Sequence, residues 1–445
     1  MKFKKFGKAF LMSALSAGVA LGITSCVQSY TVGYLWVTGT VTAQSTGNGI
    51  ISGFKIDHNT GNLVPINGLP ISSGGANPGR ALVLPGQRFI YVLNRGVNSS
   101  GGSVCTTADP CQKSNITQFA IGGNGVLSPQ ETFFTQGLNP FRIVADASGN
   151  YIYVLDHDAP SNASCALALG SGVTSCGDVT AFKVDTTTGR LTLVVNSQVT
   201  SASGTALPYF PVPANPIDFV LASGYVLTMS GTPATGDSVF PYTYNAGTGQ
   251  LTINQNSSQP LNITQGTAII GGAGYVYALD NEPITVNNIT SPSITSPSQI
   301  LPFSVGSNGA LQAQTGGAVP DDPTLSNPIY LIVESKGKWV YVANQGNNTD
   351  QNNTQSGLAG YVIDPATHQL SEIPGSPWGT GAGPQCLVED PSNQFVYTAN
   401  FNDSTVTGRV VDQNSGVLDN LPGKANRSYP LTGPAAWCMV SGRTS

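Results

Sequence analysis

Charged side chains are scarce in this chain. Asp, Glu, Lys and Arg make up 9% of its 445 residues, against about 25% in typical soluble domains. Acidic residues outnumber basic ones by 23 to 18, and no basic run occurs beyond the N-terminus. Nucleic-acid-binding proteins need a basic surface for the phosphate backbone. The sequence therefore argues against nucleic acid as a partner.

The usual motifs of metal, phosphate and serine-hydrolase sites are also missing. Only three histidines occur, and none belongs to a Cys/His spacing typical of a metal site. There is no Gly-x-Ser-x-Gly elbow, and no predicted helix follows glycine pairs such as Gly101-Gly102. We therefore expect no metal and no cofactor. Gly, Asn, Ser and Thr supply the polarity instead, which favours short strands and turns over long helices.

The N-terminus has the pattern of an export signal. Four lysines precede an apolar run from Ala9 to Ile23, which is shorter than the roughly 20 residues that span a membrane. The run ends in Thr24-Ser25-Cys26 and resembles a bacterial lipobox, in which the cysteine is lipidated. An ordinary secretory signal with a chance cysteine is the alternative. We predict a lipoprotein signal peptide (1–25), a lipidated tether that holds the protein on the membrane (26–32) and one folded domain (33–445). Val27, rather than Asp, after Cys26 is typical of an outer-membrane lipoprotein.

The cysteine count agrees with this interpretation. There are seven cysteines, so lipidation of Cys26 would leave an even number for pairing. Export would place them where disulfides persist. Four of the six lie in two pairs that are close in sequence, and the last two remain for each other. The predicted disulfides are Cys105–Cys111, Cys165–Cys176 and Cys386–Cys438.

One pattern recurs seven times with a period of about 60 residues. Its centre is a strand led by an aromatic residue, such as Tyr151-Ile-Tyr-Val. A hairpin follows, with glycine two residues before leucine, as in Gly189-Arg-Leu191. In the sixth copy His368 takes the glycine's place and is interpreted as a turn residue. A short apolar strand opened by Asn-Pro or Gly-Pro precedes most copies. Each unit therefore predicts four antiparallel strands, and the whole chain an all-β, seven-bladed β-propeller.

The first and last copies are incomplete in complementary ways. The segment from Gly433 to Val440 resembles the innermost strand of a blade, but the chain stops at Ser445. The first copy begins at its second strand, near Tyr34. We predict that the C-terminal strand completes the first blade and closes the ring, so that no sheet edge stays open. The disulfide predicted between neighbouring inner strands would lock this closure.

These residues are similar to a known family. Trp339-Val-Tyr-Val-Ala-Asn344 resembles the YVTN-type repeat, and the whole unit resembles the 6-phosphogluconolactonase-like (lactonase) seven-bladed propellers over about residues 30–440. The resemblance implies a β-propeller fold and lactone hydrolysis. Active members tend to carry a His-Pro-His stretch on one inner strand. The positions aligned with its second histidine are Gly79, Phe141, Ile217, Thr267, Ile329, Gln385 and Trp437, and none is histidine.

Candidate functional residues come from the expected channel mouth. The residues two positions after each inner-strand proline are Arg80, Arg142, Asp218, Tyr330 and Cys386. Two arginines and a carboxylate would hold an anionic ligand there, or would form an ion pair that fills the axis. The long loops 94–115, 156–178 and 344–356 are expected on the same face. His157 begins one of them between two aspartates, where it would act as a general base or metal ligand, or simply be solvated.

Three functions follow from these patterns. The first is a binding module that recognises a protein, a glycan or a small lactone through its loop-bearing face. The second is a lactone hydrolase, in which Arg80 and Arg142 polarise the carbonyl and His157 or Asp218 activates water. The third is a structural part of an envelope assembly. The missing histidine pattern favours the binding module over the enzyme.

Overall fold

The structure is a computed structural model that describes residues 30–41, 48–253, 258–286, 294–347, 354–423 and 428–442. The predicted signal peptide (1–25), Cys26 and most of the predicted tether lie outside the described residues. No helix in these ranges is both long and apolar enough to cross a membrane.

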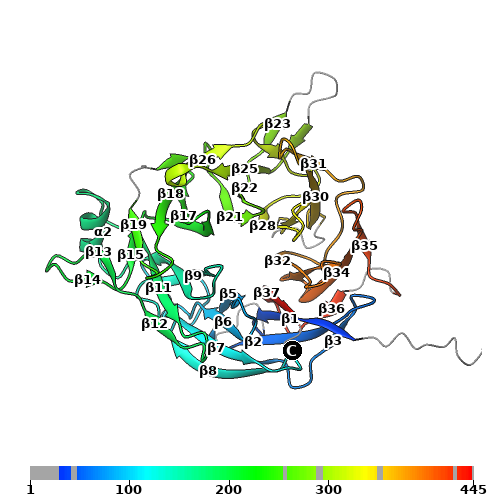
Figure 1. The fold of residues 1–445 in the computed structure, drawn as a ribbon, viewed down its shortest axis with the longest axis horizontal. Helices are drawn as coiled ribbons and strands as arrows, with labels where there is room; N and C mark the ends of the chain where they lie inside the picture. Colours follow the sequence, from blue (N-terminus) through cyan, green and yellow to red (C-terminus); the bar gives the residue numbers. More distant parts are fainter. Residues whose placement is uncertain are drawn as a thin grey trace, which may run out of the picture.

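Seven antiparallel sheets surround a central axis, which confirms the predicted propeller (Figure 1). Each sheet has four main strands, which follow one another from the axis outward. Blade 1 contains β37 (Ala435–Gly442), β1 (Thr31–Gly39), β2 (Asn48–Asp57) and β3 (Leu63–Pro65). Blade 2 contains β5 (Pro78–Val83), β6 (Phe89–Asn94), β7 (Asn115–Ile121) and β8 (Leu127–Phe133). Blade 3 contains β9 (Leu138–Ala145), β10 (Tyr151–Asp158), β11 (Gly177–Val184) and β12 (Leu191–Leu193).

The remaining blades repeat this order. Blade 4 contains β16 (Pro216–Ala222), β17 (Tyr225–Thr232), β18 (Gly236–Tyr244) and β19 (Leu251–Ile253). Blade 5 contains β21 (Gly266–Gly272), β22 (Tyr275–Asp280), β25 (Gln299–Val305) and β26 (Leu311–Ala313). Blade 6 contains β28 (Pro328–Val333), β29 (Trp339–Asn344), β30 (Gly357–Ile363) and β31 (Leu370–Glu372). Blade 7 contains β32 (Pro384–Glu389), β33 (Phe395–Asn400), β34 (Thr405–Val411) and β35 (Leu418–Asn420).

The structure also holds elements that the repeat did not predict. In five blades a short extra strand pairs with the third strand, beside the fourth. These are β4 (Ile71–Ala76), β15 (Phe210–Val212), β20 (Gln259–Pro260), β27 (Val319–Pro320) and β36 (Ser428–Pro430). The insertions are the helix α2 (Asn162–Leu169) and the hairpins β13 (Asn196–Thr200)–β14 (Ala206–Leu207) and β23 (Ile284–Val286)–β24 (Ile294–Ser296). The short turn η1 (Ser307–Gly309) is the predicted hairpin turn of blade 5.

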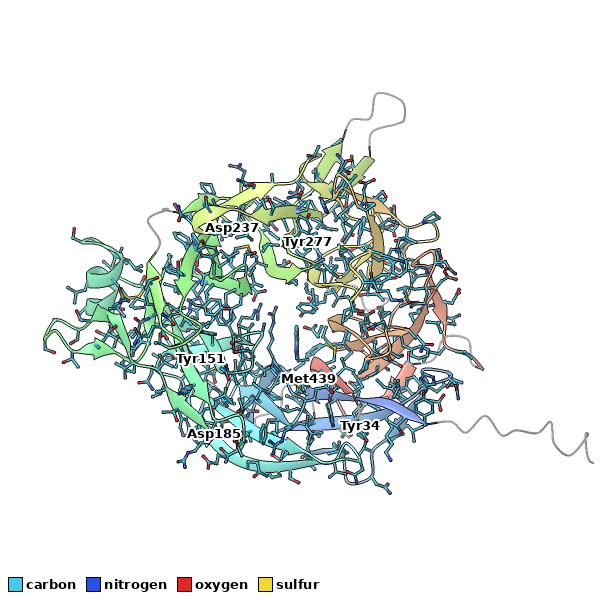
Figure 2. All side chains as sticks on the ribbon, viewed as in Figure 1. Tyr34, Tyr151, Asp185, Asp237, Tyr277 and Met439 are labelled. Carbon is cyan, nitrogen blue, oxygen red and sulfur yellow. A yellow bond between two sulfur atoms is a disulfide. The ribbon has the colours of Figure 1, made fainter. Side chains whose placement is uncertain are left out.

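The C-terminal strand closes the ring, as predicted. β37 pairs antiparallel with β1 from Gly33↔Gly442 to Gly39↔Ala435. Figure 1 shows the red end of the chain beside its blue beginning, and Figure 2 shows Met439 on the axial side of Tyr34. The Cys386–Cys438 disulfide joins the inner strands of blades 7 and 1, with their Cα atoms 5.8 Å apart. The two local disulfides are also those predicted.

Neighbouring blades are held by a repeated contact between a glycine turn and two aromatic rings. A Cβ added to Gly61 of blade 1 would lie 2.4 Å from the Phe395 ring of blade 7. The backbone of Gly61 adopts φ 66°, a conformation that glycine tolerates without steric cost. Tyr397 Oη then donates a hydrogen bond to the Gly61 carbonyl at 2.7 Å. Because the same packing recurs between other blades, the hydrophobic core is a set of layers between sheets rather than one central cluster.

The closing disulfide yields a stability prediction. Replacing Cys386 and Cys438 together by serine should lower the free energy of unfolding by about 2–4 kcal/mol, because the bond closes a long loop in the unfolded chain. Chemical denaturation of the oxidised protein measures this. The Cys105→Ser/Cys111→Ser variant is the control, since its loop spans only 6 residues and a smaller loss is expected. Equal losses in the two variants would contradict the loop-closure account.

Candidate functional site

In several inner strands, a left-handed asparagine followed by a β-bulge directs the first side chains toward the axis. Asn139 and Asn215 precede Pro140, near the start of β9, and Pro216, the first residue of β16; both asparagines have φ near 55°, which asparagine tolerates better than most residues. A register shift follows, as between Pro216 and Asp218, where Ile217 has no cross-strand partner. Such bulges bend a strand and re-aim its side chains. The residues just after the prolines therefore meet at the channel mouth.

A cavity of about 290 Å³ lies at this mouth. Its wall includes six of the seven positions aligned with the family's second histidine. These are Gly79, Phe141, Thr267, Ile329, Gln385 and Trp437. The wall therefore contains no histidine at these positions. Of the residues predicted at the mouth, Arg80 and Arg142 line the cavity. Three guanidinium groups, those of Arg80, Arg95 and Arg142, also line the cavity.

Asp218 lies beneath these arginines and is fully buried. Its Oδ2 is 3.1 Å from Arg80 Nη2, and its Oδ1 is 3.0 Å from Arg142 Nε. Its two oxygens also accept backbone N–H bonds from Phe219 and Ile269, at 2.9 and 3.2 Å. The ion pair, one of the two alternatives expected for these residues, is therefore formed. Both oxygens of this carboxylate already accept hydrogen bonds from the arginines and from the backbone.

Stacking and burial fix the arginines further. The Arg80 guanidinium carbon lies 4.7 Å from the Trp437 ring centroid and 5.5 Å from that of Tyr330. Burial, together with the charge of Arg80, lowers the pKa of Arg142 to about 10, so it stays protonated at neutral pH. Tyr330 packs edge-on against Trp437 at 4.9 Å and supports the cluster from outside the cavity lining. The structure thus brings Tyr330 to the arginines, but not to the cavity surface. Cys386 is buried in its disulfide.

Arg95 was missed by the sequence analysis. Its Nε is buried without a hydrogen-bond partner, and burial lowers its pKa. Among the described residues no carboxylate forms a salt bridge with it. Three guanidinium groups against the one carboxylate of Asp218 leave the mouth with excess positive charge. The available signal was its place directly after Asn94, at the end of β6 that faces the mouth.

His157 occupies a second cavity of about 340 Å³, which shares Arg95 and Phe141 with the first. Its Nδ1 lies 3.1 Å from Asp158 Oδ2, and its side chain is 39% exposed. Asp158 is held in turn by Asn139 Nδ2 at 2.7 Å and by Thr107 Oγ1 at 2.9 Å. His157 is therefore an oriented imidazole beside the arginine cluster rather than a member of it.

Two buried carboxyl groups lie at the base of the loop that carries His157. Asp156 and Asp178 sit opposite each other on β10 and β11, and both are fully buried. Thr180 Oγ1 lies within hydrogen-bond distance of both carboxyl groups. Burial raises the pKa of Asp156 to about 7. Burial, with the Asp156 charge next, raises the pKa of Asp178 well above its usual range. The pair therefore shares a proton at neutral pH.

Comparisons with known proteins support the fold. A sequence profile described as "Lactonase, 7-bladed beta-propeller" matches residues 289–432. A candidate 6-phosphogluconolactonase from Bacteroides fragilis has 14% identity and a TM-score of 0.64, over 92% of this chain and 98% of that one. A periplasmic gluconolactonase from Pseudomonas aeruginosa has 17% identity and a TM-score of 0.62, over 93% and 100%. The search among curated proteins found no match.

The chain is a seven-bladed β-propeller, and residues 289–432 match the lactonase profile. Its three disulfides indicate folding outside the reducing cytoplasm.

The ion-pair cluster yields a stability prediction that distinguishes Asp218, which pairs with two arginines, from Arg95, which has no ion pair. Asp218→Ala should lower the free energy of unfolding by about 3–5 kcal/mol, because it leaves two buried guanidinium groups without a counter-charge. Arg95→Ala should cost far less, since Arg95 has no ion pair to lose. Denaturant unfolding of both variants measures this. A larger loss for Arg95→Ala would contradict the assignment of Asp218 as the anchor.

The shared proton yields a pH prediction. The folded-state pKa values of Asp156 and Asp178 are raised, so the stability associated with them is complete below about pH 4 and is lost as the pH rises through the folded pKa near 7. Unfolding should become easier between pH 4 and pH 8. Asp178→Asn should flatten this slope.

The matched control is Asp185→Asn at an exposed turn. The N–H groups of Thr187 and Thr188 lower the pKa of Asp185, so its contribution has the opposite sign and is lost as the pH falls. Thermal unfolding across this pH range measures both variants. An unchanged slope in Asp178→Asn would contradict the shared proton.

Proposed function

We propose that this protein is a lipid-anchored, extracytoplasmic binding module that captures a small anionic ligand at the mouth of its central channel. The observation that carries the proposal is a cavity lined by three guanidinium groups, with one carboxylate whose oxygens already accept hydrogen bonds. Arg80 and Arg142 are already fixed by Asp218, and Arg95 keeps a buried Nε without a partner. A carboxylate or phosphate that enters the cavity would accept hydrogen bonds from these guanidinium groups.

The walls of the cavity suit a ligand with an organic body. Phe141 and Trp437 contribute aromatic surface, and Thr267 and Gln385 contribute polar groups. Small-molecule sites commonly combine apolar walls with a few convergent polar groups. Because the ring is closed and disulfide-linked, the donors are preorganised, which reduces the entropy lost on binding. The lipid anchor rests on the N-terminal pattern ending at Cys26.

A lactone hydrolase is the second candidate, favoured by the oriented His157–Asp158 pair beside Arg95. The imidazole would remove a proton from water as the water oxygen attacks the lactone carbonyl. Arg95 would stabilise the oxyanion, and the ring oxygen would leave with the proton that the imidazole returns. A similar solved structure, named as a periplasmic gluconolactonase, is in keeping with such chemistry outside the cytoplasm. Against it stand the exposure of His157 and the absence of histidine at the aligned inner-strand positions.

A calorimetric experiment tests the binding proposal. Gluconate, 6-phosphogluconate and neutral glucose are titrated into the wild type, Arg95→Ala and the control Arg190→Ala, whose exposed guanidinium pairs with Glu131. We expect the two anions to bind, glucose not to bind, and Arg95→Ala to weaken anion binding about tenfold or more. Arg190→Ala should bind like the wild type.

The corresponding lactones are then assayed for acid release with the wild type and His157→Ala. Anion binding without turnover supports the binding module. Turnover that disappears in a folded His157→Ala variant would replace it with the hydrolase. If the folded wild type shows neither binding nor turnover, both candidates are wrong.

A further inference from the structure

The contact between blades 5 and 6 departs from the repeat at one residue. Where the other six blades place a glycine on the leading aromatic ring, blade 6 has His368. His368 adopts φ 58°, a left-handed conformation that costs a residue with a Cβ about 1 kcal/mol or more. Its ring lies 4.6 Å from the Tyr275 ring of blade 5. Glycine would be the less strained residue at this turn, and such strain is often retained at functional positions.

A cavity of about 550 Å³ opens at this departure. It is lined by the turns between the first and second strands and between the third and fourth strands of neighbouring blades. These turns lie at the blade ends opposite to those that form the channel mouth, because successive strands of each blade are antiparallel. The side chains that matter below are those of Tyr275, Lys336, Lys338, His368 and Asn414. This third cavity is therefore separate from the axial arginine cluster.

Two ammonium groups occupy one wall of the cavity. Lys336 and Lys338 belong to the β28–β29 turn, which the Glu334 carboxylate holds by accepting both of their backbone N–H groups. Lys338 Nζ lies 5.5 Å from the Trp339 ring centroid, and Lys336 Nζ donates to the side-chain amide oxygen of Gln413. Neither lysine forms a salt bridge with a carboxylate in the described part of the chain. No Asp or Glu is among the described residues that line the cavity.

The cavity lining also contains aromatic rings. Tyr275, like the equivalent Tyr225 of blade 4, is only partly buried, whereas the equivalent Phe395 and Tyr34 are 2% exposed. Tyr275 and His368 line the same cavity as the two lysines, with their rings 4.6 Å apart. Aromatic faces bind the C–H face of a sugar ring, ammonium groups bind carboxylate or phosphate, and an amide such as that of Asn414 bonds hydroxyl groups.

We propose that this cavity binds an acidic sugar unit. The carboxylate or phosphate of the sugar contacts Lys336 and Lys338, and its ring packs against Tyr275 and His368. The inference stands on the His368 departure and its cavity, and it does not depend on the function proposed for the channel mouth.

Calorimetric titration of the purified protein tests this site. The probes are trigalacturonate, which carries carboxylates, glucose 6-phosphate, which carries a phosphate, and maltotriose, which is neutral. We expect at least one acidic probe to bind and maltotriose to bind at least about tenfold more weakly. The acidic probe that binds identifies the charged group, and its affinity should fall as salt is added.

Three variants assign the site. His368→Gly restores the glycine of the other blades, so it should fold at least as stably as the wild type and still lose about tenfold or more in affinity. Lys336→Ala/Lys338→Ala should lose the preference for acidic over neutral sugar. Lys183→Ala, which removes an exposed lysine of β11 in blade 3, is the matched charge control and should bind like the wild type. Arg142→Ala at the channel mouth should also leave this binding unchanged.

Several results would overturn the proposal. These are no binding of either acidic probe up to about 10 mM, equal affinity for maltotriose, unchanged affinity in a folded His368→Gly variant, or loss of this binding in Arg142→Ala. The last result would place the acidic sugar at the channel mouth instead. The variants distinguish the two sites. Anion binding that survives in His368→Gly but is lost in Arg95→Ala belongs to the channel mouth, and anion binding that is lost in His368→Gly but survives in Arg95→Ala belongs to this cavity.

Discussion

The pairing of β37 with β1 is the constraint on which the rest of the structure depends. It makes the first blade from both ends of the domain and leaves no inner strand without a neighbour. Only a closed ring directs the starts of all inner strands toward one axis. Residues far apart in sequence, such as Arg80 of blade 2 and Asp218 of blade 4, then come within 3.1 Å. Closure therefore creates the channel mouth as well as stabilising the fold.

The charge at that mouth is unbalanced in a way that stability alone does not require. Buried ion pairs are weak evidence for stability, since apolar residues of similar size often serve as well. Here two arginines are tied to Asp218, and Arg95 adds a further positive charge with no carboxylate partner of its own. Under the proposed function, these cations are held in place for an anion that enters from outside. The aromatic rings of Trp437 and Phe141 stack on these guanidinium groups and limit their movement.

The repeat predicted most of the fold, because strand pairing depends on local patterns that occur seven times. It gave the four-stranded blades and the closure, and it placed Arg80, Arg142 and Asp218 together; the count and spacing of the cysteines gave the three disulfides. It could not place His157, which lies in an adjoining cavity because the loop geometry beyond β10 is not repeated. It also missed Arg95, whose importance depends on an unpartnered Nε rather than on sequence spacing. The extra strands such as β36 follow from the paths of individual loops and have no counterpart in the shared pattern.

The proposed function requires that the three arginines form a preorganised anion site at the channel mouth. Crystals grown without other oxyanions and soaked in selenate provide the sharpest test, because selenium scatters anomalously and marks the bound anion. We expect a selenium peak within hydrogen-bond distance of Arg95 and of at least one of Arg80 and Arg142. The same crystals of Arg95→Ala should lose that peak. Anomalous peaks elsewhere, with none at the channel mouth, would contradict the account.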